Sequence, residues 1–105
     1  MQKMASTHQA AAYSATTTYL RAVTQAKTDD ADTVMAELKK MKIDDFYSKG
    51  TIRQDGRYIH DMYLMQVKTP AESKQPWDYL KLVATIPGED AFTKVADSKC
   101  YLLKK

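Results

Sequence analysis

The first half of the chain has the hydrophobic spacing of an α-helix. Small and aromatic side chains recur three or four positions apart, at Ala12, Ala15, Tyr19, Ala22, Val23 and Ala26. This spacing predicts a helix from about Gln9 to Lys27. Its face would consist mostly of small side chains, which indicates close packing against a sheet or another helix.

A second helix is predicted to follow a short acidic turn. Either Asp29 or Asp30 is suited to cap its N-terminus, because a carboxylate oxygen accepts hydrogen bonds from the free N–H groups there. Val34, Leu38 and Met41 then form an apolar stripe at helical spacing. The pattern therefore predicts a helix that ends near Met41.

After Ile43 the pattern changes to that of extended strands. Residues 51–53 and 57–68 flank the dipeptide Asp55-Gly56. Asp-Gly between two such segments is a strong hairpin signal, because glycine adopts the positive φ that tight turns require. Two antiparallel strands are the consequence.

A third strand is predicted over residues 77–86. Pro87-Gly88 ends it, since proline cannot donate to a sheet and glycine favours turns. The remaining apolar residues predict a short helical turn that carries Ala91, Phe92 and Val95.

Two of these strands carry apolar side chains on both faces. In the second strand the run is Met62, Tyr63, Leu64 and Met65. In the third, Leu80, Leu82, Ala84 and Ile86 are expected on one face, and Trp77, Tyr79 and Val83 on much of the other. Strands with this pattern are normally covered on both sides. The chain has too few other elements for that, so the cover must come from another segment or another molecule.

The composition is that of one small globular domain. With 105 residues, 44% of them hydrophobic and 28% charged, the chain can bury one modest core. No apolar run approaches the roughly 20 residues that span a bilayer, and the N-terminal residues lack the apolar segment of a secretory signal. The net charge of +3 comes from interspersed lysines and aspartates, which argues against nucleic acid as a partner.

Candidate chemical groups are few. His60 and Asp61 are adjacent on a strand and point to opposite faces, so a structural histidine is the better interpretation. Asp44 and Asp45 are interpreted as a solvated turn. The single cysteine, Cys100, can form no disulfide within the chain. Because no cluster of Cys, His and carboxylates has ligand spacing, we expect no metal, no organic cofactor and no enzymatic activity.

Several stretches together resemble one protein family in their order and spacing. They are the helix opening His8-Gln9-Ala10-Ala11-Ala12-Tyr13-Ser14-Ala15, the hairpin Gly50-Thr51-Ile52-Arg53-Gln54-Asp55-Gly56-Arg57, the strand His60-Asp61-Met62-Tyr63-Leu64-Met65-Gln66-Val67-Lys68, and Trp77-Asp78-Tyr79 with Thr85-Ile86-Pro87-Gly88. The family is the type I periplasmic solute-binding proteins of ABC importers, of the branched-chain amino acid type. The resemblance covers nearly the whole chain and matches the C-terminal third of such a receptor.

The resemblance implies a fold and a function. Receptors of this family have two α/β lobes that hold ligand in the cleft between them, so residues 1–105 would form a single partial domain, an α/β fragment of that fold. Because its strands are apolar on both faces, we expect this fragment to be completed by self-association into a homodimer. Its parent would be a periplasmic receptor that binds a small polar or carboxylate-bearing nutrient, such as an amino acid, amide or aromatic acid, for an ABC permease. The family's signal peptide lies upstream of anything present here. The alternative is a small self-associating α+β interaction module with no ligand of its own.

The candidate ligand-binding residues are His8, Gln9 and Tyr13. They open the first helix, where free N–H groups suit anions, and by the resemblance this entry faces the cleft between the lobes. A capping and packing role is the alternative for all three. The resemblance also places Cys100 in a tail where a cysteine can pair with another part of the complete protein.

Overall fold

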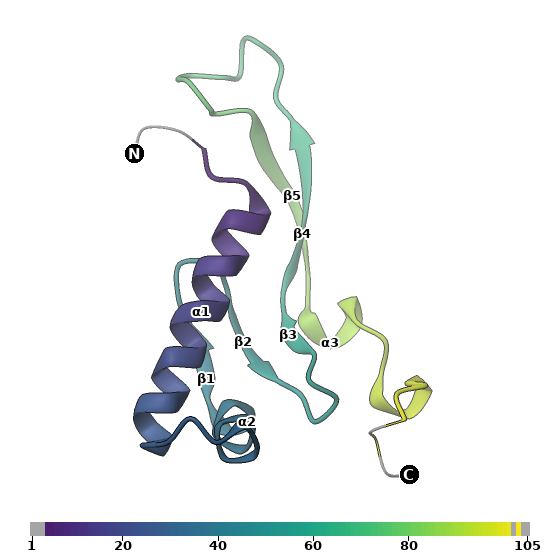
Figure 1. Ribbon diagram of the computed structural model, residues 1–105. Coiled ribbons are helices and arrows are strands. Elements are labelled where there is room, and N and C mark those ends of the chain that lie inside the picture. Colours follow the sequence, from purple (N-terminus) through teal and green to yellow (C-terminus); the bar gives the residue numbers. More distant parts are fainter. Residues whose placement is uncertain (1–3, 102, 104–105) are drawn as a thin grey trace.

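The computed structural model describes residues 4–101 and 103, and it opens with two helices that pack against each other (Figure 1). Helix α1 spans Thr7–Ala26 and helix α2 spans Ala31–Lys40. Lys27 ends α1 in the left-handed region, with φ 55°, and Asp30 caps α2 by accepting a hydrogen bond of 2.9 Å from the Thr33 N–H. Both predicted helices and the Asp30 cap are confirmed.

The buried face of α1 differs from the prediction. Its buried residues are Ser14, Thr18 and Ala22, whereas Ala12 and Ala15 are exposed. Residues four positions apart lie on one side of a helix, and this side faces the strands that follow α2. The prediction uses only the hydrophobicity of each position. Serine and threonine side chains are also small enough for the helix to pack closely against a sheet, provided that their hydroxyl groups form hydrogen bonds.

Three short strands form an antiparallel sheet in chain order: β1 (Lys42–Asp44), β2 (Lys49–Ile52) and β3 (Tyr58–His60). The turn between β2 and β3 is the predicted Asp55-Gly56 turn, with Gly56 at φ 80°. Strand β1 has only three residues, too few for the sequence to show a period of two. The sequence pattern therefore gives no prediction of it.

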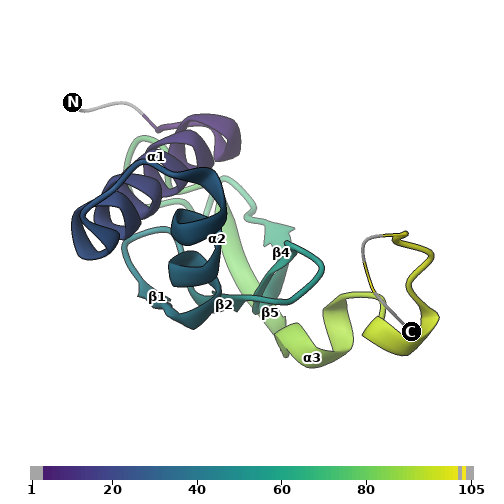
Figure 2. The same ribbon diagram turned by 60° about the horizontal axis from the view of Figure 1, so that its bottom comes forward.

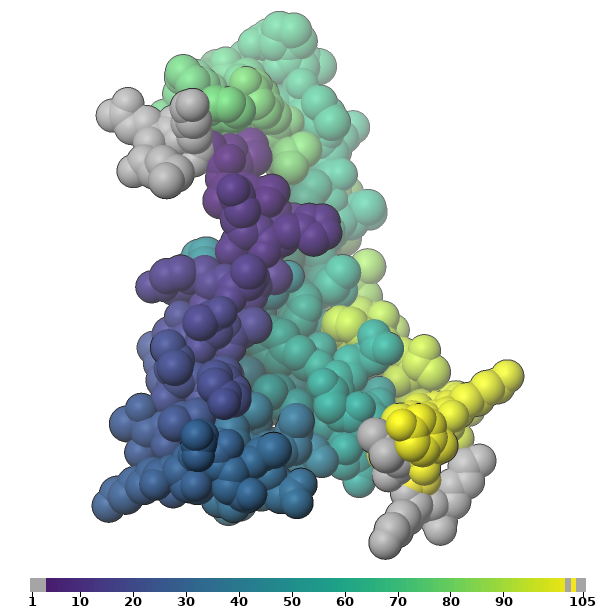
Figure 3. Space-filling view, viewed as in Figure 1, coloured from purple at the N-terminus to yellow at the C-terminus, as the bar shows by residue number. Residues whose placement is uncertain are grey.

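The predicted strand over residues 57–68 is in fact two strands. β3 ends at His60, and β4 (Met62–Val67) pairs antiparallel with β5 (Leu80–Ile86) in a separate sheet, called here the ribbon. The loop at its far end is held by the ion pairs Lys68–Asp78 and Lys81–Glu72, each with an N–O distance of 2.5 Å. This end projects beyond the start of α1 (Figures 1 and 3).

A register shift changes which residues share a face of the ribbon. Leu64 pairs with Ala84, but the next residue, Met65, pairs with Leu82. Consecutive residues of a strand point to opposite faces, and cross-strand partners share a face. Leu82 therefore lies on the opposite face from Ala84. The prediction of a single face made of Leu80, Leu82, Ala84 and Ile86 is wrong, because a bulge shifts the phase of β5.

The C-terminal residues form two short helices, α3 (Gly88–Ala91) and η1 (Val95–Asp97). The sequence predicts a single turn that carries Ala91, Phe92 and Val95, but Phe92 is extended and separates the two helices. They lie at the end of the molecule away from the far end of the ribbon, and α3 contacts β3 (Figures 1 and 2). None of the described helices is long and apolar enough to cross a membrane.

The chain is extended and has a small core. The buried apolar side chains within residues 4–101 and 103 are Ala22, Val34 and Ile43. The accessible surface is 8601 Å², against about 6,000 Å² for a typical monomer of 105 residues. The radius of gyration is 17.2 Å, against about 13 Å for a compact domain of this length. The α/β class is confirmed, and both faces of the ribbon are exposed.

Candidate functional site

A capping box formed by Ser6 and Gln9 closes the N-terminus of α1. Ser6 Oγ accepts a hydrogen bond of 3.2 Å from the Gln9 N–H, and Gln9 Oε1 accepts one of 2.9 Å from the Ser6 N–H. This reciprocal pair satisfies two backbone donors that would otherwise be free. The amide oxygen of Gln9 is therefore engaged, and its NH2 group is the part available to a ligand.

The three candidate ligand-binding residues fall on two sides of α1. Gln9 and Tyr13 are four positions apart and share one side. The Tyr13 side chain is 65% exposed and meets Phe46 edge-on, with ring centroids 5.5 Å apart. His8 is exposed and precedes Ala11 by three positions, which places it on the side that lines a cavity. The structure brings Gln9 and Tyr13 together and leaves His8 on the other side.

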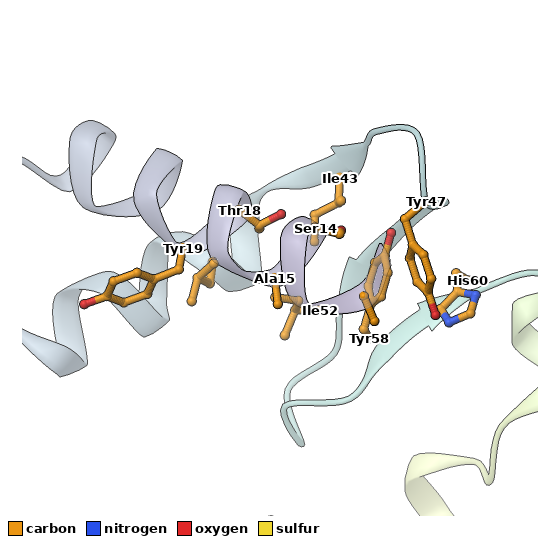
Figure 4. A pocket seen from close by; sticks show the side chains of 11 residues that line it. Ser14, Ala15, Thr18, Tyr19, Ile43, Tyr47, Ile52, Tyr58 and His60 are labelled. Atoms are coloured by element: carbon orange, nitrogen blue, oxygen red, sulfur yellow. The ribbon is translucent and has the colours of Figure 1, made fainter. Parts of the chain in front are cut away.

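A cavity of about 370 Å³ lies between α1 and the three-stranded sheet (Figure 4). Small side chains of α1 form one wall, and the strands and α2 form the rest. The lining residues are Ala11, Ser14, Ala15, Thr18, Tyr19, Leu38, Ile43, Tyr47, Ile52, Tyr58 and His60. The lining is mostly apolar, and the volume falls in the range of small-molecule sites.

The polar groups beside this cavity bond to one another. Ser14 Oγ donates to Asp45 Oδ2 at 2.5 Å, and Asp45 Oδ1 accepts from the N–H groups of Tyr47 and Ser48. The Tyr58 hydroxyl accepts from Ser48 Oγ at 3.0 Å and donates to the Ser48 carbonyl oxygen at 3.2 Å. The interpretation of Asp45 as part of a solvated turn is wrong, because its carboxylate ties α1 to the turn between β1 and β2.

These bonds decide the ionisation of the site. Burial raises the pKa of Asp45, but the hydrogen bonds from Ser14, Ser48 and Tyr47 outweigh it and hold this pKa below its ordinary value. Burial raises the pKa of the Tyr58 hydroxyl. Asp45 is thus ionised and Tyr58 neutral at pH 7. Neither is suited to exchange a proton with a substrate there.

His60 lies in an aromatic cluster at one end of the cavity (Figure 4). Its ring centroid is 5.9 Å from that of Tyr47, 5.0 Å from Tyr58 and 5.5 Å from Phe92. Its Nδ1 lies 2.8 Å from the Asp61 carbonyl oxygen. These contacts agree with a structural histidine, since the ring packs among aromatic neighbours from β3 itself, from the turn between β1 and β2 and from the residue after α3.

The described residues show no metal centre. Within residues 4–101 and 103, no group of three or more His, Cys, Asp or Glu side chains could hold a metal ion. Cys100 is half-buried and free. The expectation that the protein uses no metal or cofactor stays a prediction.

Several residues of the site were missed from the sequence. Ser14 and Thr18 line the cavity, and the hydrogen bond from Ser14 to Asp45 holds α1 to the turn between β1 and β2. The sequence contains one local signal for the two hydroxyl residues. Ser14, Thr18 and Ala22 are small residues spaced four positions apart, and this spacing places them on one side of the helix. No local signal points to Asp45. With an apolar lining and satisfied polar groups, the cavity suits apolar side chains better than a polar ligand.

Comparison with known proteins gives two close structural matches. The profile of a family described as periplasmic binding protein matches residues 1–75. A crystal structure of a periplasmic binding protein from Burkholderia mallei matches 99% of this chain and 28% of its own, with 65% identity and a TM-score of 0.93. A branched chain amino acid ABC transporter periplasmic ligand-binding protein from Burkholderia xenovorans LB400 matches 97% of this chain and 28% of its own, with 43% identity and a TM-score of 0.91. The chain thus spans 28% of the length of both structures. No curated protein matches it.

Proposed function

The chain belongs to the periplasmic binding protein family, and on this basis we propose that it forms part of an extracytoplasmic solute receptor. The solute would be a small polar or carboxylate-bearing nutrient: an amino acid, an amide or an aromatic acid. The complete receptor would act in the periplasm, bind its solute without chemical change and deliver it to an ABC permease.

The extent of the match carries this proposal. The Burkholderia mallei protein matches 99% of the chain with 65% identity and a TM-score of 0.93, so most side chains are the same and the backbone folds alike. The Burkholderia xenovorans protein is described as part of a branched chain amino acid transporter, which supports an amino acid or a related acid as the solute. We propose accordingly that residues 1–105 are a single partial domain, the C-terminal segment of such a receptor.

Within that receptor, the entry of α1 would supply one wall of the ligand cleft. The positive end of a helix favours a carboxylate, the Gln9 NH2 group can donate a hydrogen bond, and the exposed Tyr13 ring offers an aromatic surface. His8 would donate from its imidazole on the neighbouring side. The apolar cavity under α1 has no such donors and is assigned to packing.

A chimera tests the proposal. The matching 28% of the Burkholderia mallei protein is replaced with this chain, and the parent serves as control. We expect at least one member of a panel of amino acids, amides and aromatic acids to raise the melting temperature of the folded chimera, because ligand binds the native state alone. A folded chimera that no compound stabilises, beside a parent that responds, would contradict the proposal.

Variants of the chimera test the proposed contacts. His8→Ala and Tyr13→Ala should each weaken solute binding at least about tenfold, since each removes a group that faces the solute. Thr16→Ala changes an exposed residue further along α1 and should leave affinity unchanged. If both variants bind as tightly as the chimera, the residues serve only the helix cap and its packing.

The second candidate is a self-associating interaction module, which the exposed faces of the ribbon favour. We propose that the 105-residue chain, as a separate polypeptide, forms a homo-oligomer. When two identical chains associate, each can bury the apolar strands of the other without any additional segment. Sedimentation velocity over a dilution series tests this candidate, and a chain that stays monomeric would contradict it.

A further inference from the structure

We propose that Phe46 contacts the solute beside Tyr13, that Asp45 positions Phe46 there, and that the solute is accordingly an acid with an aromatic ring. The inference rests on the receptor function proposed above and deepens it, since it names one class among the candidate solutes. It follows from two contacts that join α1 to the turn between β1 and β2.

The two contacts are made by two pairs of consecutive residues. Ser14 Oγ donates a hydrogen bond of 2.5 Å to Asp45 Oδ2. Tyr13 precedes Ser14 and Phe46 follows Asp45. The rings of Tyr13 and Phe46 meet edge to face, with centroids 5.5 Å apart and an angle of 70° between their planes. All four residues belong to this chain, so these contacts need no other part of the receptor.

The Asp45 carboxylate fixes the turn as well as the helix. Its Oδ1 accepts hydrogen bonds from the Tyr47 N–H at 2.8 Å and from the Ser48 N–H at 3.1 Å. Phe46 thus lies between Asp45 and two residues that are bonded to it, which leaves its backbone little freedom. Within this chain the Phe46 ring is 67% exposed, so the polar groups of the turn hold it beside Tyr13 and its own burial does not.

An edge-to-face pair of rings favours an aromatic solute. The face of an aromatic ring is negative and its edge is positive, so a third ring packs against the pair edge-on or offset. Such a contact raises affinity about two- to tenfold beyond the effect of the apolar area that it buries. An aliphatic group of the same size buries the area without this gain. The pair therefore discriminates between an aromatic acid and an aliphatic one.

The carboxylate of such a solute has a donor on the same side of α1. Gln9 lies one helical turn before Tyr13, and side chains at this spacing have Cβ atoms about 5–6 Å apart. In the complete receptor the Gln9 NH2 group would donate to the carboxylate while the ring packs against Tyr13 and Phe46. A compact acid such as benzoate is long enough to reach both.

The chimera described above tests the solute class. It is titrated with benzoate and with cyclohexanecarboxylate, which carries the same carboxylate on a saturated ring. Benzoate should bind about three- to tenfold more tightly. Phe46→Leu should bring the two affinities to within about twofold of each other. Tyr101→Leu is the control, because it removes an exposed aromatic ring of the C-terminal tail and should keep the preference.

Variants of Asp45 separate a positioning role from a merely structural one. Asp45→Ala should lower the preference as much as Phe46→Leu does, and the double variant should lower it no further, since Asp45 acts through Phe46. Asp45→Asn should keep the preference, because its amide oxygen still accepts from both N–H groups and its NH2 group can donate to Ser14 Oγ. An Asp45→Ala chimera with an undiminished preference would overturn the positioning role.

Photolabelling gives a measurement that needs no variant to fold. The unmodified chimera is irradiated with 4-azidobenzoate and digested with trypsin, which releases residues 43–49 between Lys42 and Lys49. This peptide should carry the label, and excess benzoate should prevent labelling. A chimera that binds the saturated acid as tightly as benzoate, or that carries no label in residues 43–49, would overturn this inference alone. A chimera that binds no compound of the panel would overturn the receptor function as well.

Discussion

Asp61 Oδ1 accepts a hydrogen bond of 3.0 Å from the Gly88 N–H. Asp61 separates β3 from β4, and Gly88 begins α3, so this bond joins the two ends of the ribbon nearest the three-stranded sheet. Gly88 is buried, and a Cβ atom there would lie 2.8 Å from the His60 carbonyl oxygen. The direction in which the ribbon leaves the sheet thus depends on a residue without a side chain.

Gly88→Ala should therefore destabilise the chain. The added methyl group meets backbone atoms of His60 that cannot turn aside as a side chain would, so we expect a loss of about 1–3 kcal/mol in the free energy of unfolding. Urea unfolding measures it. Gly56→Asn is the control, because no atom lies within 4 Å of a Cβ there and asparagine tolerates its positive φ. Equal stability of Gly88→Ala and the wild type would mean that Gly88 and the His60 backbone are not packed as closely as described.

Ser14→Ala tests the bond between α1 and the sheet. The substitution leaves Asp45 Oδ2 without its 2.5 Å partner, and a half-buried acceptor that loses its donor costs about 1–3 kcal/mol. Thr16→Ala, an exposed change on the same helix, should stay within about 0.5 kcal/mol of the wild type. Thermal unfolding of both variants gives the comparison. A Ser14→Ala protein as stable as Thr16→Ala would show that the hydrogen bond between Ser14 and Asp45 does not stabilise the fold.

Acid should weaken one ion pair in the ribbon loop and one in the turn between β2 and β3. The hydrogen bond from Lys81 lowers the pKa of Glu72 from 4.5 to about 2, and that from Arg53 lowers the pKa of Asp55 from 3.8 to about 2. Because the folded state binds protons more weakly than the unfolded state, both contributions are complete above the ordinary pKa values and are lost as pH falls towards 2. The urea midpoint should therefore decrease from pH 5 to pH 2.

Glu72→Gln should flatten part of this pH dependence, whereas Glu89→Gln, an exposed change in α3, should not. The effect will be modest, since both side chains of the Lys81–Glu72 pair are about 40% exposed and water screens their attraction. Identical pH profiles for the two variants would show that the Lys81–Glu72 pair does not contribute.

The features predictable from the sequence are those whose signals are local. The Asp30 cap and the turn at Gly56 each depend on residues a few positions apart, and both are confirmed. The capping box of Ser6 and Gln9 was equally readable, because its two members are three positions apart, yet the sequence interpretation described Gln9 only as a ligand or cap candidate.

The features that could not be predicted depend on distant partners. The break at Asp61 interrupts a continuous strand pattern, and the residue it binds lies 27 positions later. Ser14 is buried beside Asp45, 31 positions away. The bulge puts Leu80 and Leu82 of β5 on the opposite face from Ala84 and Ile86. It arises from the pairing with β4, so the alternation of residues along β5 does not reveal it.

Isothermal titration calorimetry of the 105-residue chain beside the chimera tests most directly the claim that this chain supplies one wall of a solute site. Each protein is titrated with the same panel of amino acids, amides and aromatic acids. Half a cleft cannot enclose a solute, so the chain alone should bind none tighter than about millimolar, about −4 kcal/mol, and the chimera should bind at least one about a hundredfold more tightly. Stoichiometric binding by the chain alone with micromolar affinity would contradict the account.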